Sequence, residues 1–233
     1  MVRPIKTDQI PNLQEVIKET AWKQIAAYGA PALSLRAIAR ELKISAPAIY
    51  NYFPDREALV TALIIDAFTS FGDSQLAARD SVTNHDSRRK LEAIGLAYRN
   101  WAHTYPQRYQ LIFGTPIPSY KAPAEKVFPA SARSISALFS VVEELRLAGK
   151  LIADRVPVVN NKYGAYYEQW RTYSGDVHPL SLFVAMNIWA RVHGIVSLEI
   201  QGNLPPFGEN GDALYLFELN SQARQFIKEV SYE

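Results

Sequence analysis

The chain is patterned for amphipathic helices along most of its length. Apolar residues recur every three or four positions, the spacing that gathers side chains on one helical face, and glycine or proline marks many segment ends. The expected helices cover residues 11–28, 35–42, 46–52, 55–78, 88–104, 106–113, 123–148, 179–201 and 212–230. Residues 150–178 give no clear pattern, although residues 156–159 read as extended and 166–170 as a short helix. The expected fold class is all-α.

Two of these helices are short and are separated by a three-residue turn. Ser34 is placed to cap the helix at 35–42, and Ser45 to cap the helix at 46–52, where Pro47 is tolerated because the first turn leaves its N–H groups unpaired anyway. Such a pair presents one compact helix on the outside of a domain, where it can enter a DNA groove. Similar helix pairs also occur in proteins that bind no DNA, so spacing alone leaves both interpretations open.

The two short helices carry side chains suited to nucleic acid. Arg36 and Asn51 offer donors to base edges, and the hydroxyls of Tyr50 and Tyr52 suit phosphate oxygens. Residues at helix starts are also expected near the phosphate backbone, because amide dipoles there favour anions. The candidate DNA contacts are Ser34, Arg36, Ser45, Ala46, Pro47, Tyr50, Asn51, Tyr52 and Arg56. Arg40 is expected to be a solvated charge.

The run A-I-A-R-E-L-K-I-S-A-P-A-I-Y-N-Y-F-P-D-R-E-A-L resembles the DNA-binding domain of TetR-family transcriptional regulators. The resemblance covers about residues 16–67 and rests on I-A-x-x-L-x-I-S, then I-Y-x-Y-F, then an acid-Arg-Glu-x-Leu helix start. The sequence departs from the family's pattern at Lys43, where the family usually carries glycine. A left-handed backbone at that position costs a non-glycine residue about 1 kcal/mol. The resemblance implies a bacterial regulator that binds double-stranded DNA.

A second resemblance lies in the other half of the chain. Trp189, His193 and Gly194 have the spacing W-x-x-x-H-G and resemble a C-terminal domain, named for those three residues, that some TetR-like proteins carry. It covers roughly residues 91–204 and implies a helical domain that senses a ligand and dimerises. The expected organisation is therefore a helix-turn-helix DNA-binding domain at 1–60 and a helical ligand-binding and dimerisation domain at 61–233.

The helix at 180–201 is apolar around most of its circumference, so it should be buried on two sides. One side is its own domain. The other is expected to be a second copy, with the helix at 212–230 completing an intersubunit four-helix bundle. A monomeric bundle that buries the helix fully is the alternative. A dimer would set two reading helices about 34–36 Å apart, matching a palindromic operator.

The effector is expected to be a small apolar or aromatic molecule held between helices of the second half, because apolar cavities with a few polar groups are the usual small-molecule sites. The candidate ligand contacts are Trp101, Tyr105, Tyr109, Phe113, Trp170, Met186, Trp189 and His193. Aromatic residues at helical spacing are also ordinary core residues. His193 is better explained as a core histidine than as a metal ligand, and no metal or cofactor is expected. The helix at 55–78 would link the two halves mechanically.

Composition narrows the remaining choices. The net charge is +2, and residues 1–60 hold eight Lys/Arg against six Asp/Glu, so the excess lies at the DNA-binding end. The absence of cysteine excludes disulfides and thiolate metal sites. We see no signal-peptide pattern and no apolar run near the ~20 residues of a membrane span, which predicts a cytoplasmic protein. No nucleophile-base pair or phosphate loop favours an enzyme. The alternative is a helical protein acting on or carrying an apolar molecule, with the helix-turn-helix used for protein contact.

Overall fold

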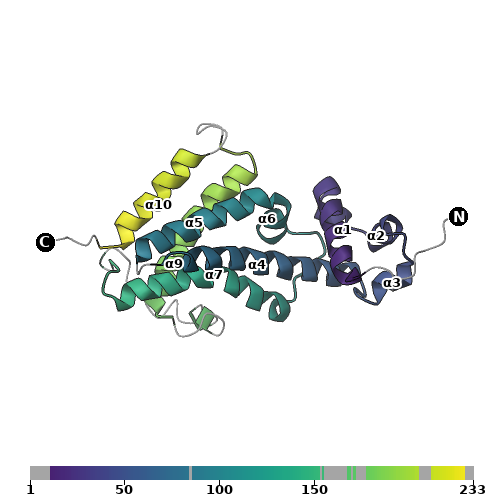
Figure 1. Ribbon diagram of the computed structural model, residues 1–233, viewed down its shortest axis with the longest axis horizontal. Helices are drawn as coiled ribbons and strands as arrows, with labels where there is room; N and C mark the ends of the chain where they lie inside the picture. Colours follow the sequence, from purple (N-terminus) through teal and green to yellow (C-terminus); the bar gives the residue numbers. More distant parts are fainter. Residues whose placement is uncertain are drawn as a thin grey trace. The chain divides into compact units, whose positions relative to one another are not determined.

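The computed structural model of the chain describes residues 11–83, 86–152, 154, 167–168, 170–171, 177–204 and 211–228. In these ranges the regular structure is helical, apart from an isolated bridge between Leu151 and Ile227, which confirms the all-α class (Figure 1). The elements are α1 (Leu13–Tyr28), the 3-10 turn η2 (Ala30–Ala32), α2 (Leu35–Glu41), α3 (Ala46–Tyr50), α4 (Arg56–Asp80), α5 (Ser87–Thr104), α6 (Pro106–Phe113), α7 (Ala124–Leu147), α9 (Pro179–Ile200) and α10 (Asp212–Phe226).

The chain divides into two compact units. The first comprises Met1–Ala67 and Tyr105–Val127, and the second comprises Phe68–Thr104 and Phe128–Glu233. Helix α4 runs through the boundary, so one continuous helix contributes residues to both units. The first unit therefore takes in residues 105–127, which the division at residue 60 expected from the sequence assigns to the second domain.

The first unit is built on aliphatic residues at helical spacing. Ile17, Ile38 and Ile49, from α1, α2 and α3, have no exposed surface, and Leu59 and Leu63 of α4 are equally buried. Each helix thus turns one apolar stripe inward, as its sequence period predicts. Figure 1 shows α1, α2 and α3 grouped together near the N-terminus.

The segment from the start of α2 to the start of α3 follows the sequence expectation in two details and departs from it in one. Ser34 caps α2, its hydroxyl accepting a hydrogen bond from the Ala37 N–H at 3.3 Å. Lys43 adopts a left-handed backbone with φ 55°. Ser45 stands at the N-cap of α3, but its side chain makes no capping bond, contrary to expectation. The reason is local, because Pro47 has no N–H and the Ala48 N–H is taken by the Ser45 carbonyl at 3.0 Å.

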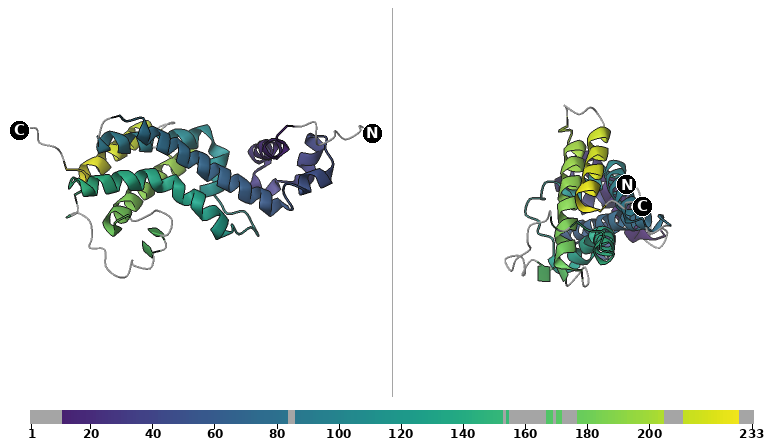
Figure 2. Two further views of the ribbon diagram at one scale, coloured as in Figure 1. Left: turned by 60° about the horizontal axis from the view of Figure 1, so that its bottom comes forward. Right: turned by 90° about the vertical axis from the view of Figure 1, so that its left-hand side faces the viewer.

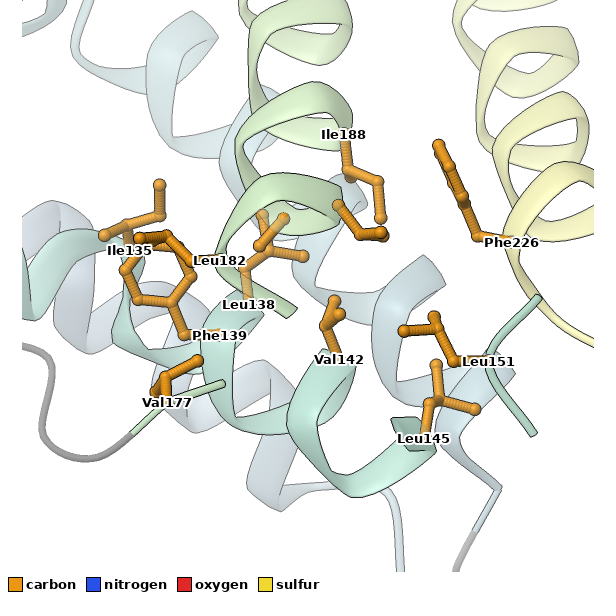
Figure 3. Close-up of a cluster of buried hydrophobic side chains, with 12 residues drawn as sticks. Ile135, Leu138, Phe139, Val142, Leu145, Leu151, Val177, Leu182, Ile188 and Phe226 are labelled. Atoms are coloured by element: carbon orange, nitrogen blue, oxygen red, sulfur yellow. The ribbon is translucent and has the colours of Figure 1, made fainter. Parts of the chain in front are cut away.

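The second unit is held by a cluster of buried aliphatic and aromatic side chains (Figure 3). Helix α7 supplies Ile135, Leu138 and Phe139, and α9 packs Leu182 and Ile188 against them. Helices α9 and α10 lie side by side in both views of Figure 2, and Phe226 at the end of α10 joins the same cluster. Sequentially distant helices therefore share one core.

Two expectations about the second half need correction. The last helix ends at Phe226 rather than at residue 230, because Ile227 leaves the helical path and pairs with Leu151. Helix α9 is long and apolar enough to cross a membrane by length and composition alone, whereas no such run was expected. The inward side of α9 belongs to the cluster of Figure 3, and a core helix passes the same test. The extended segment expected at 156–159 lies outside the described residues, and helical backbone is described at 167–168 and 170–171.

Candidate nucleic-acid interface and effector cavity

The outer surface of α3 and its flanks presents most of the predicted DNA contacts to solvent. Tyr50 and Tyr52 are 42% and 43% exposed, so neither ring belongs to the core. Ala46 and Ser34 are partly buried. The exposed members of the predicted set are Arg36, Ser45, Pro47, Tyr50, Asn51 and Tyr52. Helix α3 itself is shorter than expected and ends at Tyr50, with Asn51 as its C-cap.

The inner face of α3 fixes the orientation of these side chains. Ala48 and Ile49 are buried, and Phe53 after the helix is 3% exposed. The N–H groups of Tyr52 and Phe53 both bond the Ile49 carbonyl at 2.9 Å, so the chain stays wound beyond the helix end. A single buried side thus holds Tyr50, Asn51 and Tyr52 outward on a rigid backbone, as a groove-reading helix requires.

Arg56 differs from the other predicted contacts because the protein itself uses its guanidinium. Its Nε donates to the Leu33 carbonyl at 3.1 Å, and its Nη2 donates to the carbonyls of Ala30 and Pro31 at 2.9 and 3.1 Å. The first carbonyl belongs to Leu33, just before α2, and the other two belong to η2. Arg56 is therefore a clamp that holds the segment before α2 against the start of α4, and its expected role as a phosphate contact stays a prediction.

Three of the predicted ligand contacts belong to the first unit. Tyr105, Tyr109 and Phe113 lie on or just before α6, which packs on α1. The guanidinium of Arg108 lies 5.2 Å from the ring of Trp22 on α1 and 4.7 Å from the ring of Tyr105. These aromatic residues thus help to attach α6 to the helix-turn-helix unit.

The second unit contains a cavity of about 50 Å³ among α4, α5, α7, α9 and α10. Its wall is mainly apolar, with Leu91, Ile94, Tyr98, Ile135, Leu138, Ile188, Val192, Leu216 and Leu219 among the lining residues. Of the eight predicted ligand contacts, Trp189 lines this cavity. The polar members of its lining are Gln75, Arg88, Glu92, Asn220 and Gln222.

Trp189 and His193 belong to a small network of ring contacts and hydrogen bonds next to the cavity. Their rings stack with centroids 4.8 Å apart. The Tyr98 hydroxyl lies 2.8 Å from His193 Nδ1, and the Ser197 hydroxyl lies 3.3 Å from Nε2. Burial lowers the pKa of His193, so its neutral form is favoured. His193 is thus a core histidine with both ring nitrogens partnered.

Tyr98 connects this network to α4. Its ring meets Phe71 edge-on at 4.8 Å, and Phe71 lies at the same distance from Trp101. The Trp101 indole N–H donates to the Ser70 hydroxyl at 2.9 Å. Trp101 is therefore a structural residue between α4 and α5 and does not line the cavity.

The other two predicted ligand contacts also lie elsewhere in the second unit. Trp170 packs against Phe128 and Phe139, with ring centroids 5.5 and 5.9 Å away. Met186 is partly buried against the cluster of Figure 3. Neither lines the cavity.

The polar residues of the cavity were missed by the sequence reasoning, which searched for aromatic side chains. Two of these residues, both glutamines, can be recognised in the sequence by their positions on apolar helical stripes. Gln75 follows Leu63, Ala67 and Phe71 on the buried stripe of α4, and Gln222 precedes Phe226 on that of α10. A glutamine on an inward stripe is unusual, because burying an amide requires hydrogen-bond partners. In the described ranges, no group of three or more His, Asp or Glu residues could hold a metal ion.

The exposed reading helix on a three-helix core and the separate helical unit with an internal cavity define a helix-turn-helix transcriptional regulator. Comparison with known proteins agrees. The family model described as "Bacterial regulatory proteins, tetR family" matches residues 17–63, and that described as "Tetracyclin repressor-like, C-terminal domain" matches residues 91–221. The chain belongs to the TetR family of transcriptional regulators.

Individual relatives are similar over most of their length. The chain is 31% identical over 199 residues to the HTH-type transcriptional regulator Rv1816 of Mycobacterium tuberculosis, covering 84% of each sequence. It is 35% identical to the regulatory protein SCO4313, whose crystal structure matches with a TM-score of 0.73 over 90% of this chain and 94% of that one. A TetR variant from Acinetobacter baumannii in complex with minocycline shares the fold, with a TM-score of 0.52, 18% identity, and coverage of 94% of this chain and 98% of that one. These relatives are regulators rather than enzymes.

Proposed function

We propose that the protein is a homodimeric, effector-responsive repressor that binds a palindromic operator through α3 and its flanks. The observation that carries the proposal is the exposure of Tyr50, Asn51 and Tyr52 at the end of a short helix whose opposite face is buried. Arg36 at the start of α2 adds an exposed cation on the same segment. Base edges and phosphates would thus meet side chains whose backbone is already ordered. Such a repressor acts on the bacterial chromosome, in the cytoplasm.

The test is operator binding by fluorescence anisotropy, with DNA that flanks the protein's own gene as the probe. The double variant Tyr50→Ala, Asn51→Ala should weaken binding at least a hundredfold, since each copy loses a base and a phosphate contact worth about 1–3 kcal/mol together. Tyr28→Ala is the matched control, because Tyr28 is 76% exposed at the end of α1 and should leave affinity unchanged. Equal binding by the double variant and the wild type would refute the proposed interface.

The dimer interface is proposed on α9 and α10. The outward side of α9 carries exposed Ala190 and Leu198, and Phe217 on α10 is 70% exposed. Gly194 lies between Ala190 and Leu198, and among the described residues nothing comes within 4 Å of the position where its Cβ would stand. Glycine inside a helix costs about 1 kcal/mol relative to alanine. Packing within one copy would leave room for a side chain at Gly194. Close approach by a helix of a second copy would account for the glycine at this position.

Light scattering on size-exclusion fractions tests this interface. Gly194→Leu should convert the dimer into a monomer, because a side chain would stand where two backbones approach. Ala77→Leu, which enlarges an exposed alanine on α4, is the matched control and should remain dimeric. A monomeric wild type, or a dimeric Gly194→Leu variant, would place the interface elsewhere.

The effector response is proposed to pass through α4. This helix supplies Gln75 to the cavity of the second unit and Leu59 and Leu63 to the core of the first. An effector can alter operator binding only if it binds one arrangement of the protein more tightly than the other. A ligand that displaces Gln75 would bias α4, and therefore the first unit, whose core takes Leu59 and Leu63 from the same helix.

A further inference from the structure

Two buried glutamines from different helices line the cavity of the second unit. Gln75 of α4 is 3% exposed and Gln222 of α10 is 4% exposed, and both line the cavity. The rest of the buried wall is apolar apart from the Tyr98 hydroxyl, which is bonded to His193. The two amides are therefore the polar groups that a molecule deep in the cavity would meet.

The protein occupies both donors of each amide. Gln75 Nε2 donates to the carbonyls of Phe71 and Ser134 at 3.2 and 2.8 Å. Gln222 Nε2 donates to the Ile188 carbonyl at 3.4 Å and to Glu218 Oε1 at 2.8 Å. Rotating either amide by half a turn would set an oxygen against two other oxygens. The hydrogen-bond network therefore fixes which end of each amide is oxygen.

The two amide oxygens remain as acceptors. Among the described residues, no donor reaches Oε1 of Gln75 or of Gln222, and no fully enclosed side-chain polar atom lacks a partner. Each oxygen must therefore keep some solvent-accessible surface. Because both residues are almost fully buried, that accessible surface must face the cavity that they line. An unpaired buried acceptor costs about 1–3 kcal/mol, so a donor supplied by water or ligand is favoured there.

We propose that the cavity binds an apolar, uncharged molecule that carries hydrogen-bond donors, such as an aromatic amine, amide or hydroxyl compound, which donates to Gln75 and Gln222. This deepens the proposed function and rests on its effector-responsive part. Carboxylates are excluded from the interior because two carbonyl oxygens point their negative ends at it. Arg88 does not reverse this selection, since it is exposed at the rim together with Glu92.

The cavity must widen to admit such a molecule. A water needs roughly 10–15 Å³ of this kind of space, so the cavity of about 50 Å³ holds a few waters. Leu219 of α10 is the side chain that narrows it, because a Cβ on Gly95 of α5 would lie only 2.7 Å from Leu219 Cδ2. The Leu219 side chain is partly exposed and can turn outward without opening the core.

Indole and benzofuran test the proposal, because they match in shape and differ in one N–H donor. We expect the wild type, or the widened variant Leu219→Ala, to bind indole at least tenfold more tightly than benzofuran by calorimetry. Gln222→Met should reduce that ratio to about threefold or less, since it keeps the side-chain volume and removes the acceptor. Gln201→Met changes an exposed glutamine outside the cavity and should keep the full ratio.

Several outcomes would overturn the proposal. Equal or tighter binding of benzofuran would show that the acceptors do not select the ligand, and absence of binding to Leu219→Ala at millimolar concentration would show that the cavity is not a ligand site. If Gln222→Met does not fold, the ratio measured on the parent protein decides. Operator binding is measured on the same samples. Operator binding without ligand binding refutes this inference alone, whereas ligand selection without operator binding refutes the proposed function alone.

Discussion

The two units satisfy their polar groups in different ways. In the first unit, Ser34 caps α2 and Asp55 Oδ1 accepts from the Ala58 N–H at 2.7 Å, each bond joining residues three positions apart, and Arg56 binds three backbone carbonyls earlier in the chain. In the second unit, serines such as Ser74 and Ser131 bond carbonyls three residues away, but several charged side chains bond other side chains far along the sequence. Arg99 forms a two-pronged pair with Glu199, one hundred residues away, with both distances 2.8 Å.

This difference explains why only one unit carries a strong sequence motif. A cap or a turn depends on residues a few positions apart, so it appears as a fixed spacing that can be read directly. A pair such as Arg99 and Glu199 depends on how α5 and α9 meet, which no local pattern determines.

Removing Arg99 should have the largest effect on stability. The Glu199 side chain is 3% exposed, so Arg99→Met leaves a buried carboxylate without its main partner. Breaking a buried pair typically costs about 3–5 kcal/mol, which chemical denaturation would measure. Arg133→Met is the matched control, because Arg133 and Asp73 are both about half exposed and such a pair contributes at most about 1 kcal/mol. Equal losses from the two variants would contradict the contrast between buried and exposed pairs.

Removing the Arg56 clamp should affect the first unit by a smaller amount. Arg56→Met frees the carbonyls of Ala30, Pro31 and Leu33, and we expect a loss of about 2–3 kcal/mol, since hydrogen bonds to charged groups contribute more than neutral ones. Hydrogen exchange should accelerate at η2 and α2 and stay unchanged in α9. Arg40→Met, which removes an exposed arginine from α2, should leave exchange as it is. Unchanged exchange in Arg56→Met would disprove the clamp.

Glu143 should give the second unit a dependence on acid pH. The Arg146 guanidinium, with the Ser181 hydroxyl, lowers the pKa of Glu143 from 4.5 to about 2, despite the opposing effect of burial. The stabilisation is therefore complete above about pH 4.5 and disappears as the pH falls toward 2. Partial exposure of Arg146 reduces it to about 1–2 kcal/mol. Denaturation of Glu143→Gln across this range should lack this part of the pH dependence, and an unchanged profile would contradict it.

Lys43 offers the smallest change and the opposite sign. Its φ of 55° is unfavourable for a side chain, so Lys43→Gly should stabilise the protein by about 0.5 kcal/mol, after the greater freedom of glycine in the unfolded chain is counted. Lys23→Gly, within α1, should instead destabilise it by about 1 kcal/mol. Thermal melts of the two variants should shift in opposite directions. A shift in the same direction would show that the left-handed turn carries no strain.

The helices and the reading face were predictable because both depend on local spacing. The bounds of α6 were predicted to the residue, and the outward placement of Tyr50 and Asn51 follows from the burial of Ile49 and its neighbours. A cavity between helices of the second half was expected, but its lining was not predictable, since its wall joins five helices and its buried polar groups include two glutamines. The Arg56 clamp was not predictable for the same reason, because its carbonyl partners lie 23–26 residues away.

Hydroxyl-radical footprinting of the wild-type protein on DNA that flanks its own gene tests the central claim most directly. The account predicts two protected tracts related by a two-fold axis, with centres one helical turn of about 34–36 Å or a multiple of it apart, and both lost together in the Tyr50→Ala, Asn51→Ala variant. A single unsymmetrical tract, or symmetrical tracts that survive in the variant, would contradict it.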